Sequence, residues 1–273
     1  MPPLYVILIL LQSTLAVHLY KRQDSAPLSV LPSPEVTLKH KGSVRGSLIY
    51  FTGDLGTVSA YVGIPYAEAP VGALRFAKPV RHAGWRGRRE VTTAPPGCLQ
   101  HRQDIFPYFF KDQGEFSEDC LFLNIFTPTN AVQSTVRKLP VIFYIHGGSF
   151  SNGDGITRDG SGLAAKEGVV VVSINYRLNM LGFMNYGEGV PKNIGLHDII
   201  QALGWVQDNI ERFGGCKRKV TIIGESAGAA LVSYLHLSNK TRGLFSGSIA
   251  LSGSLNAPWA LEVKEHELRD KYQ

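Results

Sequence analysis

Short apolar runs alternate with segments of helical periodicity in the second half of the chain, and this alternation constrains the fold more than any other feature. The expected strands are 140–145, 169–175, 220–223 and 248–251. Apolar residues recur at helical spacing over 196–213, and 227–237 is a second helical stretch. Strands that alternate with helices build a mostly parallel central sheet with helices on both faces. We therefore expect an α/β fold.

Composition allows one globular domain and excludes several other classes. Of 273 residues, 44% are hydrophobic and 18% are charged, which excludes a disordered chain. The formal net charge is +6, and seven of the 28 Lys and Arg residues lie between Arg75 and Arg102. Because no nucleic-acid-binding motif accompanies them, we interpret them as a solvated surface and expect no nucleic-acid partner.

The N-terminus is typical of a secretory signal. Residues 4–11 form an unbroken apolar run, and Thr14 and Ala16 supply the small residues of a cleavage site. This run is shorter than the roughly 18 apolar residues of a membrane-spanning helix. We expect a signal peptide over 1–16, an unstructured arm over 17–35, a globular domain over 36–273, a secreted product and no integral membrane span.

Secretion changes how the three cysteines are interpreted. Cys98 and Cys120 could close a loop, which leaves Cys216 as a free thiol or a partner for another chain. Asn239-Lys240-Thr241 is the only acceptable N-glycosylation sequon in the sequence.

Two loops follow expected strands, where active sites of such sheets lie. The loop after 220–223 is Gly224-Glu225-Ser226-Ala227-Gly228, a G-x-S-x-G pattern between a strand and a helix. A sharp turn at this position lifts the serine hydroxyl off the sheet, and the flanking glycines let strand and helix approach closely. The helix N-terminus behind Ser226 favours developing negative charge.

The loop after 140–145 is His146-Gly147-Gly148-Ser149. It resembles the His-Gly-Gly-Gly oxyanion motif of esterases and lipases, with Ser149 in place of the third glycine. Its backbone N–H groups, with that of Ala227, would stabilise a tetrahedral oxyanion.

The chain resembles the type-B carboxylesterases, the carboxylesterase/cholinesterase group of the α/β-hydrolase fold. The resemblance covers roughly 36–260 and rests on segments 61–85, 117–124, 146–148, 175–183 and 213–228. It implies that Ser226 is the nucleophile, that Gly148, Ser149 and Ala227 form the oxyanion hole, and that Cys98 pairs with Cys120. The implied reaction is hydrolysis of a small-molecule carboxylic ester through an acyl-Ser226 intermediate, without a metal or organic cofactor.

The sequence departs from the family where the triad should be completed. The family places an acidic residue and then a histidine well downstream of the serine, but here only residues 227–273 follow Ser226. Their histidines are His236, which we interpret as a helix-surface or packed residue, and His266 in the charged segment 261–273. We therefore expect the N-terminal half of a carboxylesterase domain, truncated after the nucleophile region, with an incomplete site.

Three functions stay open at this point. The first is a secreted serine carboxylesterase, of which this chain is an incomplete version. The alternative is a non-catalytic cholinesterase-like binding or adhesion protein. The third is a chain that captures ester-like ligands without turnover, because a serine without its base is a weak nucleophile.

Overall fold

A computed structural model describes residues 31–51, 53–101, 114–134 and 138–261. The predicted signal peptide, most of the predicted arm and His266 lie outside these residues. Strands of the central sheet are β3 (Ser47–Tyr50), β4 (Thr57–Pro65), β8 (Phe122–Pro128), β9 (Leu139–Ile145), β10 (Val170–Ile174), β11 (Gly215–Glu225) and β12 (Gly247–Leu251). The helices are α2 (Ser161–Glu167), α3 (Asn179–Phe183), α4 (Ile194–Asn209) and α5 (Ala227–Leu237).

Smaller elements surround this framework. The strands β1 (Val36–Thr37), β2 (Ser43–Arg45) and β5 (Arg88–Glu90) form a second sheet, and β6 (Gly97–Cys98) pairs with β7 (Phe116–Ser117). Short 3₁₀ turns are η1 (Gly53–Leu55), η2 (Gly72–Leu74), η3 (Thr129–Ala131), η4 (Ile210–Phe213) and η5 (Asn239–Thr241).

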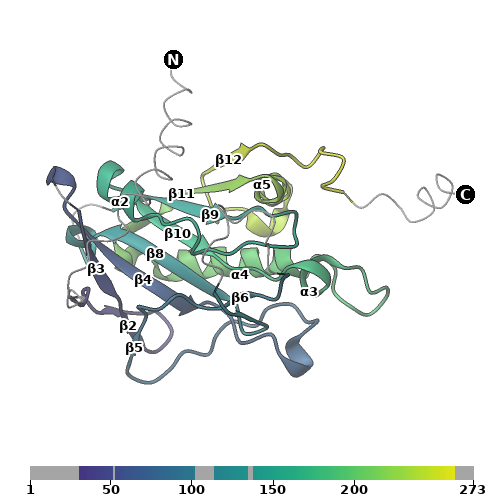
Figure 1. The fold of residues 1–273 in the computed structure, drawn as a ribbon, viewed down its shortest axis with the longest axis horizontal. Helices are drawn as coiled ribbons and strands as arrows, with labels where there is room; N and C mark the ends of the chain where they lie inside the picture. Colours follow the sequence, from purple (N-terminus) through teal and green to yellow (C-terminus); the bar gives the residue numbers. More distant parts are fainter. Residues whose placement is uncertain (1–30, 52, 102–113, 135–137, 262–273) are drawn as a thin grey trace, which may run out of the picture.

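The central sheet has the order β12-β11-β9-β10-β8-β4-β3 (Figure 1). Its β10, β9, β11 and β12 pair in parallel, whereas β10–β8, β8–β4 and β4–β3 pair antiparallel. The expectation of a mostly parallel sheet therefore holds only for the second half of the chain, and the sheet over the described residues is mixed. Parallel neighbours need long crossover connections such as helices, and the described residues of the first half contain no α-helix.

Helices cover both faces of the sheet, as expected. On one face α4 and α5 pack on a large core that includes Phe143, Val172 and Leu203. On the other face α2 packs through Ala164 on Phe126 and Val171. Neighbouring side chains of β10 thus enter different cores, which explains why its sequence is a continuous apolar run rather than an alternating one.

Both predicted helices of the second half are confirmed. Apolar positions on α4, including Ile199, Leu203 and Val206, are fully buried. The helical segment ends through η4 at Gly214, whose φ of 88° is the left-handed conformation that a helix-terminating glycine adopts. Within the described ranges, no helix combines the length and the apolar character that crossing a membrane requires.

The predicted arm over 17–35 extends too far. Leu31 accepts a hydrogen bond from Leu48 N (2.8 Å), and Ser33 N donates to Gly46 O (3.0 Å). The Ser33 side chain is buried and accepts from Gly46 N at 2.8 Å. Residues 31–35 are therefore part of the folded domain, because their backbone groups find partners on the first strands.

Candidate active site

Ser226 lies at the junction between β11, which ends at Glu225, and α5, which begins at Ala227. Its backbone has φ 55° and ψ −119°, a sparsely populated conformation that residues other than glycine rarely adopt. The turn is held from both sides. Ser226 N donates to Leu251 O on β12 (2.9 Å), and Ala229 N donates to Ser226 O (2.9 Å). The strand-to-helix context that the G-x-S-x-G motif predicts is therefore present.

The glycines of the motif bring three backbones together. A Cβ atom at Gly224 would lie 2.3 Å from Gly228 O, so the strand touches the first turn of α5. A Cβ atom at Gly228 would lie 2.3 Å from Ile145 O at the end of β9. Neither contact tolerates a side chain, since both clashing atoms belong to the backbone. Close approach, rather than flexibility, explains the two glycines.

The loop after β9 lies directly against the serine. A Cβ atom at Gly147 would be 2.5 Å from Glu225 O and 3.2 Å from Ser226 Cβ. Gly148 and Ser149 follow, with φ values of 96° and 56°. In the part of the chain that the structure describes, the N–H groups of Gly148, Ser149 and Ala227 donate no hydrogen bond. Of these three residues, Ala227 directly follows Ser226, and Gly148 and Ser149 follow Gly147, which lies against the serine.

The buried side chain of His146 helps to fix the conformation of this loop. Its ring is buried and stacks on Tyr176, with 4.2 Å between the ring centroids. The ring Nδ1 lies 2.8 Å from Gly147 O, which requires Nδ1 to carry the proton, and Tyr176 Oη donates to His146 O (2.6 Å). Burial lowers the pKa of His146, so the imidazole is neutral at pH 7. Its exchangeable proton is already used within the loop, which makes it a structural residue.

Side chains from distant segments hold the same loop. Asn179 donates through its backbone N to Phe150 O and through Nδ2 to Ser151 O, both at 2.8 Å. Gln100 binds both backbone groups of Gly153, accepting from its N (2.8 Å) and donating to its O (2.9 Å). These bonds hold residues 150–153, which directly follow Ser149 and its left-handed backbone conformation.

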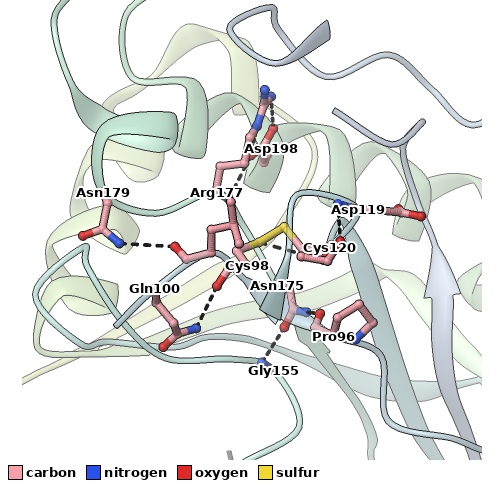
Figure 2. The surroundings of a disulfide bond; sticks show 12 residues. Pro96, Cys98, Gln100, Asp119, Cys120, Gly155, Asn175, Arg177, Asn179 and Asp198 are labelled. Atoms are coloured by element: carbon pink, nitrogen blue, oxygen red, sulfur yellow. Dashed lines mark hydrogen bonds and ion pairs between the residues drawn. A yellow bond between two sulfur atoms is a disulfide. The ribbon is translucent and has the colours of Figure 1, made fainter. Parts of the chain in front are cut away.

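Gln100 and Asn179 in turn connect this loop to a disulfide (Figure 2). Cys98 and Cys120 are bonded, with 5.0 Å between their Cα atoms, and both are buried. The pairing that the family resemblance implies is confirmed. Gln100 Nε2 also donates to Cys98 O at 3.0 Å, so hydrogen bonds of Gln100 link the disulfide to the loop after β9. Cys216 is a free, half-buried thiol.

A buried ion pair, which the sequence reasoning missed, lies next to the disulfide (Figure 2). Arg177 donates from Nε (2.8 Å) and Nη2 (2.6 Å) to the two carboxylate oxygens of Asp198 on α4. Nη1 of Arg177 reaches the backbone carbonyls of Arg75 (3.1 Å) and Ala77 (2.9 Å). Burial raises the pKa of Asp198, and Arg177 opposes that rise. Asp198 lies four residues after Ile194 and four before Ala202 on the buried stripe of α4, and this spacing was the available signal.

No described residue completes a triad at Ser226. Ser226 Oγ makes no hydrogen bond to the residues that the structure describes. His236 is exposed and ten residues further along α5, a separation of about 15 Å in a helix. It pairs with Ser248 Oγ at 3.2 Å. His236 is therefore a helix-surface residue, the first of the two interpretations given above, and no described histidine forms a hydrogen bond with Ser226.

The chain is similar in sequence to several known proteins. Neuroligin-2 of mouse is 40% identical over 255 residues, 82% of this chain and 30% of the relative. Cocaine esterase of rabbit is 45% identical over 216 residues, 77% and 40% of the two chains. Acetylcholinesterase of chicken is 40% identical over 270 residues, 95% and 34%.

A thermophilic PNB esterase of known structure aligns with a TM-score of 0.72 at 38% identity, covering 81% of this chain and 44% of that one. The chain thus spans between 30% and 44% of the lengths of these relatives. The structural likeness confirms the α/β-hydrolase fold. The carboxylesterase family profile matches residues 32–272, nearly the whole described domain, and the chain therefore belongs to the carboxylesterase family.

Proposed function

We propose that the protein is a carboxylic ester hydrolase of the serine-esterase type, with Ser226 as nucleophile. One observation carries this proposal. Ser226 lies on a strained turn between the end of β11 and the N-terminus of α5, and the loop after β9 lies against the Ser226 side chain at Gly147. A loop that only connects a strand to a helix needs neither the strain nor the unbonded donors beside it.

The first step forms the acyl-enzyme. Ser226 Oγ attacks the ester carbonyl carbon, its proton passes to a general base, and the carbonyl oxygen becomes an oxyanion. The N–H groups of Gly148, Ser149 and Ala227 stabilise that oxyanion, each donor contributing about 2.7–4 kcal/mol by analogy with other oxyanion holes. The C–O bond to the alcohol then breaks, the base returns its proton to the alcohol, and acyl-Ser226 remains.

The second step releases the acid. Water loses a proton to the base and attacks the acyl carbon, and Ser226 leaves with that proton as the free hydroxyl. The described residues bring no imidazole to Ser226, so we assign the base and its acidic partner to residues beyond them. The chemistry needs neither a metal nor an organic cofactor, and the substrate class is a small-molecule carboxylic ester.

Secretion is part of the same proposal. The apolar run 4–11 with its small-residue cleavage site supports removal of residues 1–16 and export. The Cys98–Cys120 disulfide supports an oxidising destination, because such bonds persist outside the cytosol.

A second candidate is a non-catalytic binding or adhesion protein. It is favoured by the 40% identity to neuroligin-2, whose name, unlike those of the esterases, does not describe an enzyme. It is also favoured by the absence of a base beside Ser226 among the described residues. In that case the fold would serve as a recognition surface, and Ser226 would carry no chemistry.

Ester turnover by the secreted full-length gene product separates the two candidates. We expect hydrolysis of p-nitrophenyl butyrate that Ser226→Ala reduces by roughly 10⁴-fold or more. Ser233→Ala is the matched control on α5, because Ser233 Oγ only bonds Ala229 O (3.0 Å), and it should retain full activity. Absent turnover, or turnover unaffected by Ser226→Ala, would refute the hydrolase proposal.

A further inference from the structure

The turn η5 follows α5 and begins at Asn239, the first residue of the sequon Asn239-Lys240-Thr241. Asn239 is exposed, and its side chain makes no hydrogen bond to the described residues. The turn is held instead by its neighbours, since Ser238 Oγ accepts from Lys240 N at 3.2 Å. We propose that Asn239 carries an N-linked glycan, a modification independent of the hydrolase proposal.

The sequon residues differ in accessibility, which determines when the modification occurs. Thr241 is 2% exposed, and its hydroxyl bonds Ser238 O (2.8 Å) and Leu235 O (2.5 Å). A glycosyltransferase that recognises the threonine hydroxyl cannot reach it in the folded domain. The glycan is therefore added to the nascent chain, before α5 and η5 close over Thr241, and the folded turn then leaves the Asn239 side chain in solvent.

The transfer uses a lipid-linked oligosaccharide diphosphate as donor. Asn239 Nδ2 attacks the anomeric carbon of the first sugar and loses a proton. A C–N bond forms, the C–O bond to the diphosphate breaks, and the lipid diphosphate leaves. Threonine at the third position and lysine at the second satisfy the acceptor motif.

The position of the glycan is compatible with an active Ser226. Ser226 precedes the first turn of α5 and Asn239 follows the last, so the sites are separated by the length of the helix, more than about 15 Å. Near Asn239 the structure exposes Leu237, which is 67% accessible. A glycan on η5 therefore lies beside the exposed Leu237 side chain and leaves the serine open.

The compartment requirement is met by an independent feature. Cys98 and Cys120 form a buried disulfide, and such bonds are made in the oxidising lumen where N-glycans are also attached. A chain that acquires the disulfide therefore meets the glycosylation machinery on the same route.

The test uses the protein secreted by animal cells and peptide N-glycosidase F. We expect a mobility increase after the enzyme treatment, and a mass increment at position 239 when deglycosylation is done in H₂¹⁸O. Asn239→Gln should abolish the shift, whereas Thr241→Ser, which keeps both the sequon and the hydroxyl, should retain it. Both variants should label at Ser226 as the parent does with a fluorophosphonate.

Two results would overturn the proposal. One is an unmodified peptide 239–241 in the parent protein, read directly by mass spectrometry. The other is a shift that persists in Asn239→Gln. The peptide measurement on the parent decides the matter even where a variant is poorly secreted. Loss of ester turnover with a glycosylated Asn239 would refute the hydrolase proposal alone.

Discussion

The buried pair between Arg177 and Asp198 allows a quantitative prediction. The side chains are 3% and 0% exposed, and two hydrogen bonds of 2.8 and 2.6 Å join them. Asp198→Asn keeps the volume and removes the charge, so it creates no cavity. It leaves the guanidinium buried without its counter-charge, and removal of one partner of such a pair costs about 3–5 kcal/mol. That is a large part of the 5–15 kcal/mol typical of a domain.

A double-mutant cycle isolates this effect. The cycle compares Arg177→Met and Asp198→Leu singly and together. The double variant removes both charges, but the carbonyls of Arg75 and Ala77 lose their donor and Arg177 N loses its acceptor. Because the second substitution no longer leaves a buried charge unpaired, the double variant should lose less stability than the sum of the two single variants. Urea denaturation monitored by tryptophan fluorescence gives the free energies. A cost below about 1 kcal/mol for Asp198→Asn, or additive effects of the two substitutions, would refute the reasoning.

Three further predictions follow from the same structure. Gly228→Ala should abolish Ser226 labelling, because its Cβ would lie 2.3 Å from a β9 carbonyl; Gly162→Ala, with no atom within 4 Å of the new Cβ, should label normally. Cys98→Ser should lower the free energy of unfolding by about 3 kcal/mol, while Cys216→Ser should leave it unchanged in the same denaturation assay. Burial lowers the pKa of His146, so the unfolded chain binds its proton more tightly. Stability should therefore decline as pH falls below the ordinary histidine value of about 6.5, and His146→Gln should flatten that decline in melts between pH 7.5 and 5; an unchanged slope would contradict it.

The sequence predicted the second half of the fold well, and the reason is local. Burial of one face of α4 gives apolar residues at helical spacing, and burial of both faces of β10 gives a continuous apolar run. Each pattern can be recognised from the sequence of that element alone. The antiparallel strands β3, β4 and β8 were not assigned, since their pairing joins segments far apart in the chain. The start of the domain was also missed, because residues 31–35 are ordered by contacts with Gly46 and Leu48 rather than by their own composition.

For the candidate site, too, local patterns in the sequence predict its location but not the contacts from distant segments. Its location follows from the rule that parallel strands end at one edge, which selected the loops beginning at His146 and Gly224. The contacts that hold the first loop come from Gln100 and Asn179, and no local pattern marks them. Asp198 differs from these residues, because its position on the buried stripe of α4 marks it as a buried carboxylate, but the sequence does not identify Arg177 as its partner.

Covalent labelling shows directly whether Ser226 is the reactive nucleophile that we propose. The protein produced in animal cells is treated with a fluorophosphonate and digested, and its peptides are mapped by mass spectrometry. We expect one phosphonylated site, at Ser226, which lies on the strained turn beside the loop that follows β9. A folded protein that leaves Ser226 unmodified, while serines elsewhere react equally, would contradict it.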